Sequence, residues 1–402
     1  MLTYAGLLSR GFKLANRVMP DSAFQVGEID PLLRAAGANP SPSARAGLQE
    51  LLASIHAESD LSLFGRLALR WDLIRLLRNA QLIEDAHVAN PALAATPVQN
   101  PLFILGLPRS GTSFLHDLMA QDAGSQVPRN WQMIYPAPRP AGFNPVGDKR
   151  VIKVDKQLDL FNGLAPGFRE LHPIYADSPQ ECSEITAHVF QSLRFDSTHR
   201  VPAYFNWLEA HGHDDALLFH KKFLQFLQNG RSERWVLKCP DHTFTLDAIL
   251  RVYPDARFVI LHRDPIAVLG SVAHLTQVLR QPFLRNIDAG EIGAQVSSRW
   301  IQGANLLLQF DQRDDVPASR KFHMQYEEFT AAPLAAIQRI YAHFDEDLTS
   351  SAGQAMETLI KAKPRGGYGR HAPYRLETFK LSAASLQNGF LPYVKQYCQP
   401  AR

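Results

Sequence analysis

The sequence has few cysteines, no dense block of like charge and no long apolar run. Three cysteines in 402 residues are too few for a disulfide framework, which favours a reducing compartment, and we expect a cytoplasmic location. The 42 Lys and Arg nearly balance the 39 Asp and Glu, leaving a net charge of +3. General nucleic-acid binding is therefore not expected. No segment reaches the roughly 18 consecutive apolar residues of a membrane-spanning helix, so no membrane span is expected.

Apolar residues make up 46% of the chain, enough to bury a full core. Leucine-rich helical spacing predicts helices over 42–56 and 62–78, and a Pro-rich linker follows at 90–101. We therefore predict a helical N-terminal cap or subdomain over residues 1–97 and an α/β domain over residues 98–402. The α/β domain is expected to be a three-layer structure around a parallel sheet. Its strands are predicted at about 102–106, 234–238, 257–262 and 320–325.

The segment PLFILGLPRSGTSFLH is the most informative in the chain. An apolar strand runs into a Gly-rich turn and then into helical spacing, so the backbone N–H groups around Ser110–Ser113 are expected at a helix N-terminus, where anions bind. The spacing Gly106-x4-Gly111 matches that of the nucleotide P-loop, but Thr112 stands at the position of the P-loop lysine and Arg109 supplies the cation. This difference argues against an ordinary ATPase or kinase.

Two more predicted strands end in residues suited to anion and proton chemistry. In RFVILHRDPIAVLGS, Arg263 ends the strand and Ser271 lies in the next helix. Arginine offers a planar fork for phosphate oxygens, and the serine hydroxyl is a second donor. In RWVLKCPDHTFTL, Lys238 ends the strand and His242 follows. A lysine can neutralise developing negative charge, and a histidine can accept a proton near neutral pH.

Together these segments resemble the sulfotransferases, whose phosphosulfate-binding loop is similar to LPRSGTSFL. The resemblance covers roughly residues 100–380 and is to the large bacterial-type branch. It implies a P-loop-like fold and a sulfotransferase that uses 3′-phosphoadenosine 5′-phosphosulfate (PAPS) as sulfonate donor and releases adenosine 3′,5′-bisphosphate. The implied acceptor is the hydroxyl or amine of an apolar small molecule or lipid. No metal is implied, and a homodimer is compatible with the sequence.

The resemblance also implies roles for individual residues. Lys238 would contact the bridging oxygen, and the base that deprotonates the acceptor stays open between His242, which is the first choice, and Glu181 or His172. The basic, Gly-containing segment KAKPRGGY would close over the 3′-phosphate of the donor. The implied donor-binding residues are Arg109, Ser110, Gly111, Thr112, Ser113 and Phe114 in the loop, Arg263 and Ser271 for the 3′-phosphate, Tyr326 near the adenine, and Arg365 and Gly367 in the basic segment.

Each of these residues also has a structural alternative. Phe114 and Tyr326 can be core-packing residues. Lys238 can be an ordinary surface lysine, and His242 can cap a helix. Glu181 can be an ordinary carboxylate in the first turn of a helix. Two other functions stay open, namely a P-loop kinase or NTPase, which needs the missing lysine, and a non-catalytic nucleotide-binding protein of the same fold.

Overall fold

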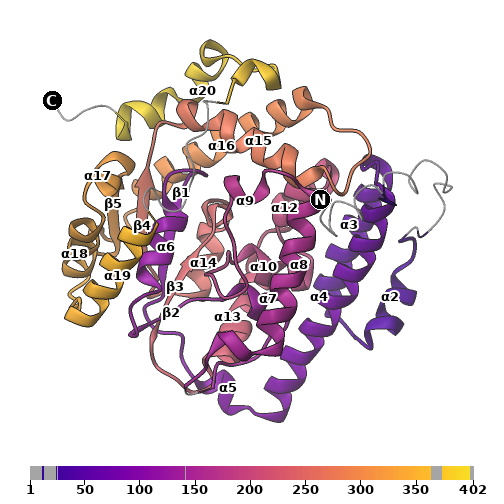
Figure 1. Ribbon diagram of the computed structural model, residues 1–402, viewed down its shortest axis with the longest axis horizontal. Helices are drawn as coiled ribbons and strands as arrows, with labels where there is room; N and C mark the ends of the chain where they lie inside the picture. Colours follow the sequence, from indigo (N-terminus) through magenta and orange to yellow (C-terminus); the bar gives the residue numbers. More distant parts are fainter. Residues whose placement is uncertain (1–10, 13–23, 25, 141, 364–373, 399–402) are drawn as a thin grey trace, which may run out of the picture. The chain divides into compact units, whose positions relative to one another are not determined.

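The computed structural model of the protein describes residues 11–12, 24, 26–140, 142–363 and 374–398 (Figure 1). It divides into two compact units. Unit 1 comprises Met1–Pro97, Pro128–Ser232 and Thr276–Ile287, and unit 2 comprises Val98–Val127, Glu233–Leu275 and Asp288–Arg402. The sequence predicts a single division at residue 97, whereas unit 1 also contains residues 128–232 and 276–287.

Unit 2 is built on a five-stranded, all-parallel sheet of order β2-β3-β1-β4-β5. The prediction of an α/β fold around a parallel sheet is confirmed. β2 was not predicted, because a strand of two residues has no periodicity to read. The strands are β1 (Leu102–Gly106), β2 (Ser125–Gln126), β3 (Arg234–Lys238), β4 (Arg257–His262) and β5 (Lys321–Gln325).

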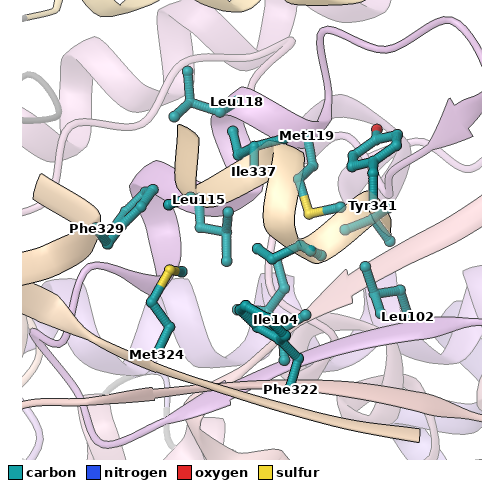
Figure 2. Packing of buried hydrophobic residues seen from close by; sticks show 14 of the residues in the cluster. Leu102, Ile104, Leu115, Leu118, Met119, Phe322, Met324, Phe329, Ile337 and Tyr341 are labelled. Carbon is teal, nitrogen blue, oxygen red and sulfur yellow. The ribbon is translucent and has the colours of Figure 1, made fainter. Parts of the chain in front are cut away.

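Helices α6 (Thr112–Met119), α18 (Pro333–His343) and α19 (Ser350–Ala362) cover one face of this sheet. Side chains that alternate along the strands pack against apolar side chains of these helices, as the two-residue period of a strand requires. Figure 2 shows this core, with strand residues Leu102, Ile104, Phe322 and Met324 beneath Leu115, Leu118, Met119, Ile337 and Tyr341.

The intervening strand residues point to the opposite face, where α16 (Ala289–Asp311) packs. Phe103 of β1 stacks on Phe258 of β4 with ring centroids 5.9 Å apart, and Phe258 meets Phe310 of α16 at 4.8 Å. Helices on both faces give the predicted three layers. The other helices of this unit include α14 (Leu246–Val252), the start of α15 (Pro265–Arg280), α17 (Tyr326–Ala331) and α20 (Ala383–Tyr397).

Unit 1 is helical over its described residues. Ser41 caps α3 by accepting from the N–H of Ala44, and Ser62 caps α4 by accepting from the N–H of Gly65. No helix among the residues described is both long and apolar enough to cross a bilayer. The helices are α2 (Ile29–Ala36), α3 (Pro42–Glu58), α4 (Leu63–Ala89), α5 (Ala92–Ala95), α7 (Asn130–Ile134), α8 (Lys149–Leu164), α9 (Phe168–Leu171), α10 (Ser183–Thr186), α11 (Arg194–Thr198), α12 (Pro202–His211) and α13 (Asp214–Gln228).

A buried group of charges ties α4 to α10 and α11. The carboxylate of Asp72 pairs with Arg75 and with Arg194, each at 2.5 Å, and Arg194 also pairs with Glu184 at 3.2 Å. Burial opposes ionisation of Asp72, but attraction to Arg194 and Arg75 outweighs it and holds the pKa of Asp72 below its ordinary value. The carboxylates of Asp72 and Glu184 together therefore neutralise two arginines that would otherwise be costly to bury.

The substitution Asp72→Asn is expected to lower the free energy of unfolding by about 3–5 kcal/mol, because it leaves two arginines facing a neutral amide. Urea denaturation measures this loss. Asp30→Asn is the matched control: its partner Arg45 and Asp30 are 42% and 64% exposed, so the loss there stays below about 1 kcal/mol. Equal losses in the two variants would contradict this account.

Candidate functional site at the carboxyl edge of the sheet

The loop between β1 and α6 has a tightly constrained backbone. Gly106, Arg109 and Gly111 have φ values of +144°, +68° and +90°. A Cβ on Gly106 would lie 2.6 Å from the carbonyl oxygen of Leu261, and one on Gly111 would lie 3.0 Å from the ring of Tyr326. Both glycines are therefore required where the loop touches β4 and α17. For Arg109, the left-handed conformation is a strain of the kind that accumulates at functional sites.

Hydrogen bonds hold the loop in this shape. The Ser110 hydroxyl, which is buried, donates to the carbonyl oxygen of Leu107 at 2.7 Å. From the other side, Nη1 of Arg263 donates to the carbonyl oxygen of Arg109 at 2.7 Å. The Gly-rich loop thus leads directly into α6 at Thr112, as the sequence predicts, and presents the helix N-terminus at the carboxyl edge of the sheet.

Arg263 and Tyr326 meet beside this loop. They follow the register pair His262 and Gln325 at the ends of β4 and β5. The guanidinium carbon of Arg263 lies 3.8 Å from the centre of the Tyr326 ring. This stacking holds the guanidinium against the tyrosine ring, so the guanidinium covers one face of that ring. Ser271 lies farther along, in α15, and is half-buried.

Lys238 approaches the loop from β3. Its side chain is buried, with the residue 4% exposed, and Nζ donates to the Ser113 hydroxyl at 2.9 Å. Lys238 pairs in register with Ile104 and shares the α6 face of the sheet. The structure therefore brings together Arg109, Ser113, Lys238, Arg263 and Tyr326 around one helix N-terminus.

His242 does not share that face. It lies in a 3₁₀ turn after β3, is 4% exposed, and packs edge-on against Phe103 with ring centroids 5.0 Å apart. Phe103 points away from α6, because its neighbours Leu102 and Ile104 are the residues that face α6. The imidazole thus belongs to the layer opposite Lys238.

The other predicted residues have varied surroundings. Phe114 is 7% exposed and packs on Phe329 in the core beneath α6, which favours its packing alternative. His172 and Glu181 belong to unit 1 and are half-buried, with the ring of His172 5.9 Å from that of Phe168. Arg365 and Gly367 lie outside the described residues.

The described chain resumes at Tyr374, which sequence reasoning did not single out. Its ring stacks on His274 of α15 with centroids 4.7 Å apart. A Cβ added to Gly270 would lie 2.7 Å from the carbonyl oxygen of Tyr374. The segment after the basic residues thus packs on α15 beside Ser271. Tyr374 lies six residues beyond the end of the basic segment at Tyr368, and no local pattern in the sequence identifies it.

Comparison with known proteins agrees with this geometry. A family model described as the sulfotransferase family matches residues 101–350. Omega-hydroxy-beta-dihydromenaquinone-9 sulfotransferases Stf3 of Mycobacterium bovis and Mycobacterium tuberculosis are each 25% identical over 259 residues. That match spans 60% of this chain and 62% of the length of each relative.

Two crystal structures of sulfotransferases have the same fold over most of the chain. STF1 of Mycobacterium tuberculosis H37Rv has a TM-score of 0.80 and 26% identity, over 92% of this chain and 99% of that structure. STF9 of Mycobacterium avium has a TM-score of 0.83 and 26% identity, over 94% and 98%.

The substitution Gly106→Ala is expected to lower the free energy of unfolding by about 1–3 kcal/mol, because the new Cβ meets the backbone of β4 at a φ that alanine avoids. A thermal melt followed by circular dichroism measures the change. Gly353→Ala serves as the control: it lies in α19 with nothing within 4 Å of the added Cβ, and it should stabilise the helix by about 0.5–1 kcal/mol. An unchanged melting temperature for Gly106→Ala would show that the loop is not constrained as described.

Proposed function

This chain belongs to the sulfotransferase family, and we propose on that basis that it transfers a sulfonate group from PAPS to the hydroxyl of a lipid-like acceptor. The observation that carries the proposal is the convergence of Lys238 and Arg263 on the two sides of one strained anion-binding loop. Each cation is held by a hydrogen bond to that loop, at 2.9 Å to Ser113 and 2.7 Å to Arg109.

In the proposed site the loop binds the 5′-phosphosulfate end of the donor. The backbone N–H groups of Gly111, Thr112 and Ser113 lie at the helix N-terminus, where they can donate to negative charge. The N–H of Ser110 donates to the carbonyl oxygen of Leu107 at 3.3 Å, so we assign Ser110 the role of shaping the loop around the donor. The left-handed conformations of Arg109 and Gly111 help to form a concave array of such donors. This arrangement supports binding of an anion without the phosphate-binding lysine of the P-loop, whose position Thr112 occupies.

The 3′-phosphate is assigned to Arg263 and Ser271. Arg263 donates Nη1 to the loop, so its remaining N–H groups can form a fork for phosphate oxygens. We assign Tyr326 the role of orienting this guanidinium and of lying near the adenine. Arg365 and Gly367 are proposed to close over the same phosphate, and the packing of Tyr374 beside Gly270 supports a return of the chain to this side of α15.

The proposed reaction is an in-line displacement at sulfur. The acceptor oxygen forms a bond to sulfur while the bond from sulfur to the bridging phosphate oxygen breaks, which yields a sulfate ester and adenosine 3′,5′-bisphosphate. Lys238 neutralises the negative charge that develops on the bridging oxygen. As in phosphoryl transfer, positioning and charge neutralisation by preformed groups supply most of the catalysis.

The acceptor's proton goes to a base. Among the three candidates, His242 packs against Phe103 in the layer opposite Lys238. His172 and Glu181 are half-buried members of unit 1. The three residues therefore stay candidates for this base, with His242 the first choice from the sequence.

A lipid-like acceptor is proposed from the relatives. The curated Stf3 proteins are named for a hydroxylated menaquinone, a long apolar alcohol. A kinase is disfavoured by Thr112 at the position of the P-loop lysine. A binding protein without activity would tolerate loss of Lys238.

Calorimetric titration with adenosine 3′,5′-bisphosphate tests the donor site. We expect the bisphosphate to bind and ATP to bind more weakly, since ATP lacks a 3′-phosphate. Arg263→Ala should weaken bisphosphate binding about 10- to 100-fold, the effect of losing hydrogen bonds to a charged group. Arg320→Ala, a half-buried arginine at the amino end of β5, should leave it unchanged. Preference for ATP, or no effect of Arg263→Ala, would contradict the proposal.

The substitution Lys238→Ala is expected to lower kcat about 100- to 1,000-fold, as loss of one preorganised donor to transition-state charge does. Radiolabelled sulfonate transfer to a long-chain alcohol measures kcat. Lys222→Ala in unit 1, an exposed lysine paired with Glu84, should retain full activity. Unchanged turnover of Lys238→Ala would overturn the assignment of this residue, and bisphosphate binding without turnover in the wild type would favour a non-catalytic protein.

A further inference from the structure

Polar side chains form a continuous chain behind the donor site, on the α16 face of the sheet. His262 ends β4 and is fully buried, and His323 lies beside it on β5. Nδ1 of His262 lies 2.9 Å from the Tyr393 hydroxyl, and Nε2 lies 2.9 Å from Nδ1 of His323. Nε2 of His323 lies 3.1 Å from Oδ1 of Asp311. The chain thus links two strands to α16 and α20.

The carboxylate determines the direction of every hydrogen bond in this chain. A carboxylate only accepts, so Nε2 of His323 carries the proton and Nδ1 accepts from Nε2–H of His262. Nδ1 of His262 then accepts from the hydroxyl of Tyr393. The hydroxyl of Tyr397 donates to the other oxygen of Asp311 at 2.7 Å, and the Tyr397 ring is parallel to that of His262 with centroids 3.9 Å apart.

Both imidazoles are neutral in this arrangement. Burial, together with the neighbouring His323, lowers the pKa of His262 to about 3. Burial also lowers the pKa of His323, although Asp311 raises it. Lys321 of β5 and, through its charge from the opposite face of β5, His343 of α18 also lower the pKa of His323. The chain therefore adds no positive charge to the strand ends.

The chain ends directly beside two donor-site residues. Arg263 follows His262, and Tyr326 follows Gln325, the register partner of His262. The bond between His262 and His323 thus adds a side-chain link to the backbone ladder that joins the two strand ends from which Arg263 and Tyr326 emerge. The stacking of these two side chains at 3.8 Å depends on the spacing of those strand ends.

We propose that His262, His323 and Asp311 are positioning residues for donor binding: their hydrogen-bonded chain holds the ends of β4 and β5 so that Arg263 and Tyr326 meet the 3′-phosphate and adenine. This inference rests on the proposed function. It assigns these residues no contact with the donor and no part in proton transfer to the acceptor.

The decisive comparison is between His323→Leu and His323→Asn. Leucine removes the acceptor for Nε2–H of His262, whereas the side-chain oxygen of asparagine can replace Nδ1 as acceptor. His323→Leu should raise the Kd of adenosine 3′,5′-bisphosphate and the KM of the donor about tenfold, the scale of a modest misplacement. Asparagine should restore both to within about threefold of wild type. The KM of the acceptor should not change in either variant.

His343→Leu is the matched control. This histidine is half-buried and packs against Phe322, on the opposite face of β5, with ring centroids 5.3 Å apart. The variant His343→Leu removes an imidazole next to the same strand without altering the hydrogen-bonded chain. Its Kd for adenosine 3′,5′-bisphosphate should therefore equal that of wild type. If His323→Leu fails to fold by circular dichroism, His323→Gln takes its place, since its amide can donate to Asp311 but does not reach the position of Nδ1.

Each outcome decides the inference. A wild-type Kd for His323→Leu, or equal weakening by leucine and asparagine, would overturn it while leaving the sulfotransferase proposal intact. Equal weakening in His343→Leu would also overturn it, by showing a general packing effect. If wild-type protein does not bind the bisphosphate, the proposed function fails and the inference fails with it.

Discussion

The proposed donor site depends on the hydrogen bond from Arg263 to the carbonyl oxygen of Arg109. That bond joins the end of β4 to a loop whose backbone adopts a left-handed conformation at a non-glycine residue. Such a conformation costs energy and persists only when its surroundings hold it. The close approaches at Gly106 and Gly111 and the bond from Ser110 supply the remaining constraints. The loop is therefore preorganised by protein contacts.

The two units stabilise their buried polar side chains in different ways. In unit 1 the charges of Asp72 and Glu184 compensate Arg75 and Arg194. In unit 2 the imidazole of His262 is kept neutral by burial. A neutral chain can be buried beside Arg263 without repelling it, whereas a second cation there would compete for the same anion. The positive charge at this edge of the sheet thus comes from the cations that face the loop.

Much of the α/β framework could be read from the sequence. Three strands were predicted at their observed bounds, and the fourth differed by one residue, because each is a short apolar run that ends in a polar residue or glycine. α4 runs on to Ala89, beyond the predicted end at residue 78, since neither proline nor glycine interrupts the chain before Pro91. The meeting of Lys238, Arg263 and the loop followed from parallel strands ending at one edge.

The sequence by itself determined the fold class, the Gly-rich loop and the cations that converge on it, because these depend on local periodicity and on the order of strands and helices. Only the tertiary structure decided which face each side chain takes. It placed His242 against Phe103, Phe114 in the core, and His262 in contact with His323 and Asp311. These contacts join residues that are distant in the chain, and no local pattern encodes the register and packing that bring them together.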